Sequence, residues 1–307
     1  MKINKYSFSL LYRVKSFIKE YINPFYRFLV SISLKKFNNE IKSDQKLFFE
    51  ERPLFTHIEI ETVNRCNNDC SFCPVNRHAD IREYEKMEES LFEKIIDNLK
   101  DLQYDKDISF YSNNEPLLDD RIYDFIKYSK KSIPNARHIL YSNGIMLNIK
   151  RYEKLFACGL DFLLIDNYSD DGKLIKSVQE LYDYYLINEN INSDKTEIVL
   201  RRKTETLSNR GGTSPNGKES KTLNLSCYLP FKQLVIRPSG KVSLCCYDSY
   251  GKTDMGDLNK LSIEELWYGG KHFGILSHLY KKGRDGISIC EKCDAAASSK
   301  KVWGGIE

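Results

Sequence analysis

Residues 64–74 read Asn-Arg-Cys-Asn-Asn-Asp-Cys-Ser-Phe-Cys-Pro and place three cysteines, Cys66, Cys70 and Cys73, on one short segment. The spacing is C-x3-C-x2-C, and the segment follows an alternating stretch, 57–62, that predicts a strand. Three thiolates can hold three irons of a [4Fe–4S] cube and leave the fourth iron open to a small molecule. We therefore expect an iron–sulfur centre with one open iron at this loop.

Two other roles for these cysteines are open on their spacing alone. Three thiolates with one further ligand can bind zinc, and His78 follows Cys73 by five residues. A disulfide scaffold is disfavoured because nine cysteines in 307 residues is too low a density, and the N-terminus has no A-x-A-like cleavage signature. Clustered thiols that are kept for metal predict a reducing, cytoplasmic compartment.

Size and charge narrow the class of protein. A chain of 307 residues fits one large domain and a smaller one. The formal charge of +4 is concentrated in residues 1–50, which hold ten Lys/Arg against four Asp/Glu, and the rest of the chain is slightly acidic. A nucleic-acid-binding protein carries its positive charge on the folded domain, so we expect no nucleic-acid partner.

The basic segment 1–50 is also amphipathic. Leu10, Val14, Phe17 and Tyr21 recur at helical spacing, and Pro24 is expected to end or kink that helix. A second apolar run covers 25–34, but neither run reaches the ~18–20 apolar residues that a membrane span needs. Two roles remain open: peripheral contact with anionic lipid through an interfacial helix, or an extension that packs on the barrel or forms a dimer contact.

Strand-like and helix-like segments alternate from residue 55 onward. We predict strands at 57–62, 107–111, 137–141, 162–165 and 196–200, and helices at 89–102, 121–131, 149–158 and 173–187. This rhythm is typical of parallel βαβ units and predicts an α/β fold with a partial (β/α)6-type barrel. Chemistry in such barrels lies on loops at the C-terminal ends of the strands, and the first of these loops carries the three cysteines.

A composition break and a second cysteine set follow. Residues 201–221 are rich in Gly, Ser, Thr, Asn and charge and predict a linker. Beyond it, 234–237 and 242–246 predict a β-hairpin, and 262–267 predicts a helix. Four thiols, those of Cys227, Cys245, Cys290 and Cys293, suit either a closed [4Fe–4S] cluster or a structural zinc ion.

The two cysteine sets together resemble those of radical S-adenosylmethionine (SAM) enzymes with a C-terminal SPASM/twitch domain. The second set is embedded in matching features: Cys227-x-x-Pro-Phe, Gly240-Lys-Val-x-x-Cys-Cys, Met255-Gly-Asp-Leu, the helix at 262–267, and Cys290-x-x-Cys-Asp. Only five cysteines lie here, against seven in the full SPASM form, so the resemblance implies the twitch form with a single auxiliary [4Fe–4S] cluster. The separations are similar to those of 2-deoxy-scyllo-inosamine dehydrogenase-like members, which implies Cys245 as a ligand and Cys246 as its buried neighbour.

The resemblance covers about residues 55–294 and implies a domain division. Residues 1–50 form the N-terminal extension, 51–205 the radical SAM partial barrel, 206–226 a linker, and 227–307 a small α+β SPASM/twitch domain. Cys158, in a helix tail before Gly159, is expected to pack as a small hydrophobic residue.

The resemblance also implies a SAM site. Ser112-Asn-Asn-Glu-Pro occupies the place of the family's Gly-Gly-Glu-Pro loop, so we place Ser112, Asn114 and Glu115 near the methionine end of SAM, although both glycines are replaced by asparagine. The other expected SAM contacts are Phe72 beside the last cysteine, Ser142 and Asn143 after the third strand, and Asp166 after the fourth. Arg210, in Asn-Arg-Gly-Gly, is expected to hold a substrate hydroxyl, phosphate or carboxylate, or else to be a solvated linker residue.

The implied activity is reductive cleavage of SAM to a 5′-deoxyadenosyl radical that removes hydrogen from a substrate. We expect oxidation of an alcohol on a sugar- or cyclitol-like small molecule, with a flavodoxin- or ferredoxin-type electron donor. Two alternatives stay open: a peptide-modifying maturase, and a metal-binding scaffold without activity. Residues 1–50 look too short for the peptide-docking domain that such maturases usually carry.

Overall fold

The computed structural model describes residues 2–5, 24–188, 193–205, 208–217, 225–300 and 302–303. Its centre is a sheet with the strand order β1-β6-β5-β4-β3-β2-β7-β8. The strands are β1 (Lys2–Lys5), β2 (His57–Ile60), β3 (Asp107–Ser109), β4 (Arg137–Ser142), β5 (Phe162–Tyr168), β6 (Thr196–Arg201), β7 (Gln233–Ile236) and β8 (Val242–Ser243). Every pairing is parallel except that of β7 with β8.

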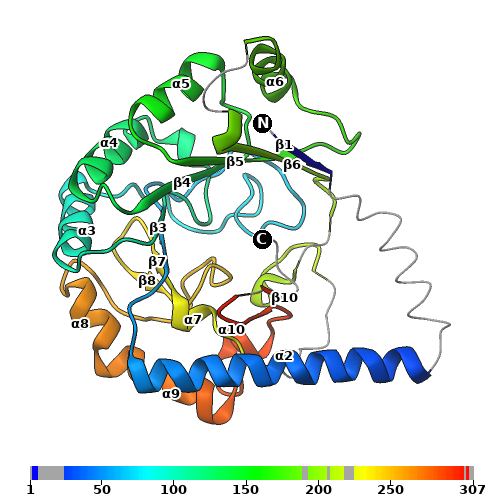
Figure 1. Cartoon of the computed structure of the whole chain (residues 1–307), viewed down its shortest axis with the longest axis vertical. Helices are drawn as coiled ribbons and strands as arrows, with labels where there is room; N and C mark the ends of the chain where they lie inside the picture. Colours follow the sequence, from blue (N-terminus) through cyan, green and yellow to red (C-terminus); the bar gives the residue numbers. More distant parts are fainter. Residues whose placement is uncertain are drawn as a thin grey trace.

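Four helices cover the outside of the curved sheet (Figure 1). They are α3 (Glu89–Asp101), α4 (Ile122–Ser132), α5 (Ile149–Ala157) and α6 (Lys176–Asn188). Each of α3, α4 and α5 buries one apolar stripe against the strands, as in α3, where Leu91, Ile95 and Leu99 are buried. The predicted alternation of strands and helices, and with it the α/β barrel, is confirmed.

One strand was not predicted from the sequence, and one predicted strand makes an additional, unexpected pairing. β1 pairs in parallel with β6 and extends one end of the sheet. The predicted hairpin forms as β7 and β8, but β7 also pairs in parallel with β2, so the main sheet continues into the segment that we had placed in the auxiliary domain. The domain boundaries remain a prediction.

The C-terminal part surrounds the second cysteine set. It contains α7 (Leu229–Lys232), α8 (Ile263–Tyr268), α9 (Gly270–Lys282), α10 (Ser288–Glu291) and a small pair of strands, β9 (Ala296–Ala297) and β10 (Val302–Trp303). The predicted helix at 262–267 is α8, which begins with a capping box between Ser262 and Glu265. Short 3₁₀ turns, η1 (Pro116–Leu118), η2 (Ser193–Lys195) and η3 (Arg210–Gly212), occur in the loops.

The described part of the N-terminal extension is a single long helix, α2 (Pro24–Glu51), which begins at the proline that we expected to end a helix. The amphipathic helix expected before Pro24 lies outside the described residues. Phe48 of α2 contacts the rings of Phe231 and Trp267, and Gln45 donates a hydrogen bond to the Cys227 carbonyl. Figure 1 shows α2 running alongside α9. This helix therefore packs on the C-terminal part of the protein.

None of the helices within the described residues has the length and apolar content needed to cross a bilayer.

Candidate active site at the C-terminal ends of the strands

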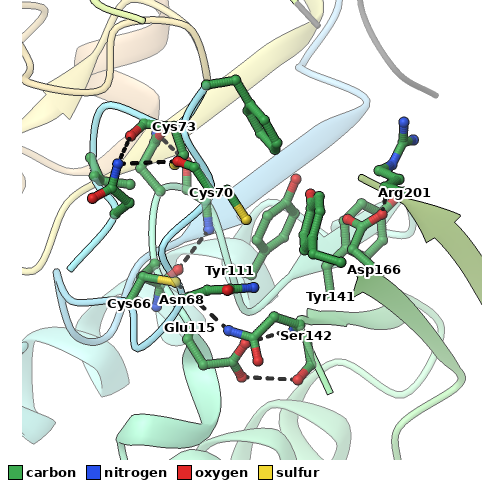
Figure 2. Close-up of a pocket in the computed structure, with 18 of the residues that line it drawn as sticks. Cys66, Asn68, Cys70, Cys73, Tyr111, Glu115, Tyr141, Ser142, Asp166 and Arg201 are labelled. Atoms are coloured by element: carbon green, nitrogen blue, oxygen red, sulfur yellow. Dashed lines mark hydrogen bonds and ion pairs between the residues drawn. The ribbon is translucent and has the colours of Figure 1, made fainter. Parts of the chain in front are cut away.

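The three cysteines of the first set lie on the loop after β2 and line one cavity of about 200 Å³. Asn76 shapes this loop: its Nδ2 donates to the carbonyls of Cys70 and Cys73 at 3.1 and 2.8 Å, and its Oδ1 accepts from the amides of His78 and Ala79. Figure 2 shows the three cysteines on one side of the cavity and the Asp166–Arg201 pair on the other. Sequence reasoning missed Asn76, although an asparagine three residues after the last cysteine of a motif is a common turn-forming residue.

The chemistry of these thiols fits a metal cluster. Burial raises the pKa of Cys66 to about 12, and the charges of Glu115 and Cys73 raise it further in the same direction. Burial and the neighbouring Cys73 and Cys66 likewise raise the pKa of Cys70. One of these cysteines is buried and two are half-buried; as thiolates they would repel one another, and bound cations such as cluster irons remove that cost. Within the described residues, no three His, Cys, Asp or Glu side chains converge tightly enough for a single metal ion, so we propose the ligand roles from the motif and the shared cavity.

The cavity brings together every residue predicted to contact SAM or substrate. Its lining contains the following predicted residues: Phe72, Ser112, Asn114, Glu115, Ser142, Asn143, Asp166 and Arg210. They come from the loops after β2, β3, β4 and β6, from the last residue of β4 and from β5 itself, as expected for the C-terminal face of a β/α barrel. His78, the possible zinc ligand, is not in this lining and is hydrogen-bonded to Arg77.

Glu115 is a buried connector, only 1% exposed. Its Oε1 accepts hydrogen bonds from the Leu117 amide and the Ser142 hydroxyl at 3.1 and 2.9 Å, and its Oε2 accepts from the Asn143 amide at 2.7 Å. Burial raises its pKa to about 7, although these hydrogen bonds act in the opposite direction. Asn143 continues the connection, because its Nδ2 donates to Asn67 and lies 3.7 Å from the Cys66 sulfur.

Asn113 and Asn114, which replace the two glycines of the family's loop, do not adopt a left-handed backbone conformation. Among described non-glycine residues, positive φ angles occur only at Arg52, Gln103 and Arg210. Asn113 donates to the Cys246 carbonyl, and Asn114 Oδ1 accepts from the Ser112 amide, so both side chains shape the loop. The Nδ2 of Asn114 is buried and without a partner, which leaves a donor suited to a carboxylate of SAM.

Two arginines in the cavity differ in their surroundings. Arg201, which sequence reasoning missed, donates to Asp166 at 3.1 Å, and burial raises the pKa of that aspartate despite the guanidinium. Arg210 donates to the neutral amide of Asn113 at 3.3 Å and lies over the Tyr247 ring at 5.7 Å. It is half-buried with its guanidinium toward the cavity, so the alternative of a solvated linker arginine is wrong.

The second cysteine set gathers in the C-terminal part. Cys245 and Cys293 belong to a buried apolar cluster, with Cys227 packed against it. Burial first, and then the charges of Cys246, Cys290, Cys227 and Cys293, raise the pKa of Cys245. Cys246 also packs against this cluster, but it is half-buried rather than buried as expected, because it lines the first cavity. Cys158 lies apart at the end of α5 and is partly buried against the main core, as expected.

Comparison with known proteins identifies the family of this chain. A family model described as the radical SAM superfamily matches residues 60–181, and one described as an iron–sulfur cluster-binding domain, SPASM, matches residues 227–294. The S-adenosyl-L-methionine-dependent 2-deoxy-scyllo-inosamine dehydrogenase of Niallia circulans is 30% identical over 243 residues, 78% of this chain and 93% of the relative.

Two solved structures of BtrN also match. The crystal structure in complex with AdoMet and 2-DOIA is 26% identical with a TM-score of 0.69, and the match covers 82% of this chain and 99% of that one. The structure described as an open conformation is 23% identical with a TM-score of 0.60, covers 79% and 93% of the two chains, and supports the fold alone.

Proposed function

This chain belongs to the radical SAM superfamily and carries a C-terminal SPASM domain, and on that premise we propose that it oxidises one ring alcohol of a cyclitol to a ketone. The observation that carries the proposal is the neighbouring pair Cys245 and Cys246. Cys245 joins the second thiol set while Cys246 lines the cavity of the first. A dehydrogenase needs both a hydrogen-abstracting centre and a nearby electron acceptor, and this pair supports the proposal because it links the first cavity to the second thiol set through adjacent residues.

In this proposal Cys66, Cys70 and Cys73 hold the SAM-binding cluster, and Cys227, Cys245, Cys290 and Cys293 hold an auxiliary [4Fe–4S] cluster. When bound, SAM and the first cluster supply a 5′-deoxyadenosyl radical that removes a hydrogen atom, and the auxiliary cluster supplies a one-electron acceptor. Glu115 and Asn114 offer an acceptor and a donor to the methionine end of SAM.

The remaining cavity residues are proposed to bind SAM and substrate and to shield them from water. Ser142 and Asn143 hold the strand end beside SAM, and Asp166 with Arg201 forms the opposite wall. The rings of Phe72 and Tyr168 lie with their centroids 5.6 Å apart, and such an aromatic wall excludes water from a radical. Arg210 offers its guanidinium to substrate oxygen atoms, and a ring that carries several hydroxyl groups matches these amide, hydroxyl and guanidinium groups.

Other parts of the proposal concern the cellular setting. We propose a flavodoxin- or ferredoxin-type donor, because reductive cleavage of SAM needs an electron, and a reducing compartment, in which clustered thiols stay reduced. We also retain the division at residues 51, 206 and 227 as a proposal.

Anaerobically reconstituted protein, incubated with SAM, dithionite and 2-deoxy-scyllo-inosamine, tests this function. We expect 5′-deoxyadenosine and a ketone in equal amounts, with deuterium moving from the ring carbon into 5′-deoxyadenosine. The matched control replaces Cys66, Cys70 and Cys73 by alanine and should form neither product. If deuterium moves from a peptide but not from any cyclitol or sugar, the protein is a maturase and the proposal is wrong.

A further inference from the structure

One buried carboxylate below the cavity, that of Glu59, takes no part in the proposed contacts with the clusters, SAM or substrate. Glu59 on β2 is 4% exposed; its Oε1 accepts a hydrogen bond from Gln233 Nε2 at 2.5 Å, and its Oε2 has no partner. Ser109, its register partner on β3, is also fully buried with an unpartnered Oγ. Unpaired polar groups destabilise a protein interior, so two of them side by side point to a functional requirement.

The strand register places Glu59 one layer below the cavity. Tyr111 follows Ser109 by two residues, and Tyr141 stands two residues beyond Ile139, the register partner of Ser109. Both tyrosines line the cavity, and their rings stack with centroids 4.5 Å apart. Burial, followed by the negative charge of Glu59, raises the pKa of Tyr141 to about 12 and that of Tyr111 well above its ordinary value. Both hydroxyl groups are therefore neutral and able to pass a proton on.

The side of Glu59 away from the cavity leads toward solvent. His57, two residues earlier on the same strand, has its Nε2 3.7 Å from Glu59 Oε1 and a side chain that is 25% exposed. Gln233 fixes the carboxylate from the other side, because its Oε1 accepts the Cys246 amide at 3.1 Å while its Nε2 holds Glu59. The titratable groups facing Glu59 are thus His57 on its own strand, the two tyrosines on β4 and after β3, and Cys246 after β8.

We propose that Glu59 receives the proton that leaves the substrate alcohol, through the Tyr111–Tyr141 pair, and that His57 passes it to solvent. This inference rests on the proposed function. Oxidation of an alcohol to a ketone removes one hydrogen atom, one electron and one proton; the hydrogen atom goes to the deoxyadenosyl radical, the electron to the auxiliary iron–sulfur centre, and the proton to Glu59 Oε2. Glu59 does not line the cavity, so it does not touch the substrate and receives the proton only through the two tyrosines.

The other acidic groups at the cavity are engaged elsewhere. Glu115 uses both oxygens to accept three hydrogen bonds from protein donors. Asp166 is paired with Arg201. Among the fully buried carboxylate oxygens of the described residues, Glu59 Oε2 is the one without a hydrogen-bond partner.

The test compares Glu59→Gln with wild type and with Glu264→Gln, an exposed surface carboxylate, using 2-deoxy-scyllo-inosamine deuterated at the reacting carbon. We expect Glu59→Gln to keep deuterium transfer into 5′-deoxyadenosine, to keep KM, and to lose ketone formation by about 10²–10⁴-fold, the usual contribution of a proton acceptor. Wild-type kcat should fall at acidic pH, and Glu59→Asp should retain that acid limb while Glu59→Gln loses it. A merely structural glutamate would not separate Asp from Gln in this way.

Each contrary outcome has a distinct meaning. Equal kcat and equal pH profiles in wild type and Glu59→Gln overturn the inference alone. A raised KM with unchanged kcat also overturns it and assigns the carboxylate to binding of the substrate ammonium. Wild-type protein that cleaves SAM but forms no ketone overturns the proposed function and this inference with it. If Glu59→Gln fails to retain iron, His57→Phe provides the measurement: it should lower kcat without changing KM, and no change in kcat refutes the route.

Discussion

Replacing Arg284 by methionine is expected to disorder the auxiliary cysteine site. This guanidinium is buried, and it donates to the carbonyls of Leu225 at 2.6 Å and Cys293 at 2.7 Å, to that of Ala295, and more distantly to that of Ser226. These acceptors belong to the two segments that carry Cys227 and Cys293. One side chain therefore joins the beginning and the end of the second thiol set.

The three close carbonyls set the magnitude. Methionine leaves each of them without its donor, and a buried unpaired polar group costs about 1–3 kcal/mol, so the free energy of unfolding should fall by about 3–9 kcal/mol. That is comparable with the whole stability of a typical domain, about 5–15 kcal/mol. Lysine at position 284 keeps the charge but not the planar fork of donors, and we expect it to recover about half of the loss. Lys282→Met, at an exposed position on α9, should change stability by less than about 0.5 kcal/mol.

Two measurements check this prediction. Urea unfolding of the iron-free protein should show the order wild type, Arg284→Lys, Arg284→Met. After reconstitution, iron should fall from about eight atoms per chain to about four in the methionine variant, since only the first cluster remains. An Arg284→Met protein that unfolds at the wild-type urea concentration and keeps all its iron would refute the reasoning.

Three further predictions concern other parts of the site and its support. The pKa of Glu115 is about 7 in the folded protein against an ordinary 4.5, so the folded state binds a proton more tightly than the unfolded state. The contribution of this group to the free energy of unfolding is complete below about pH 4.5, and about 3 kcal/mol of it is lost as the pH rises to 7. Glu115→Gln should flatten this pH dependence in unfolding measured at pH 5, 6 and 7, and an unchanged slope would contradict the assignment. Asn76→Ala removes four hydrogen bonds from the cysteine loop and should lower iron retention of the first cluster, seen as a loss of SAM cleavage with the auxiliary signal intact by EPR. Phe48→Ala should cost about 3–5 kcal/mol because the ring is buried against Trp267, whereas Leu47→Ala, on the exposed side of the same helix, should unfold like wild type.

The sequence predicted the barrel well because short strand-like segments alternate regularly with amphipathic helices. Each of the five predicted strands is found within a few residues of its expected range, and in β5 the burial alternates along the strand. β1 has the sequence Lys-Ile-Asn-Lys, which shows neither pattern. The pairing of β7 with β2 joins residues that are more than 170 positions apart, and no local pattern reports such a distance.

The residues of the candidate site also fall into those that the sequence predicted and those that only the structure revealed. Residues inside motifs, such as Glu115 and the cysteines, were found because their types and spacing are distinctive. Arg201 and Glu59 sit on strands without any motif, and their roles follow only from which face of the strand they occupy and what lies opposite. The position of Arg210 in the cavity likewise depended on a left-handed turn at η3, with φ of 48° at Arg210 and 61° at Gly211.

The geometry around Cys246 connects these residues into one arrangement. Its amide is held by Gln233, which also holds Glu59, and its carbonyl accepts from Asn113, which contacts Arg210. The residue before it, Cys245, belongs to the auxiliary thiol set. The backbone beside the proposed electron acceptor therefore also holds the proposed proton acceptor and the arginine proposed to bind substrate. A shift of this loop should disturb electron loss, proton loss and substrate binding together, whereas hydrogen abstraction, which is proposed to depend on the loop after β2, should persist.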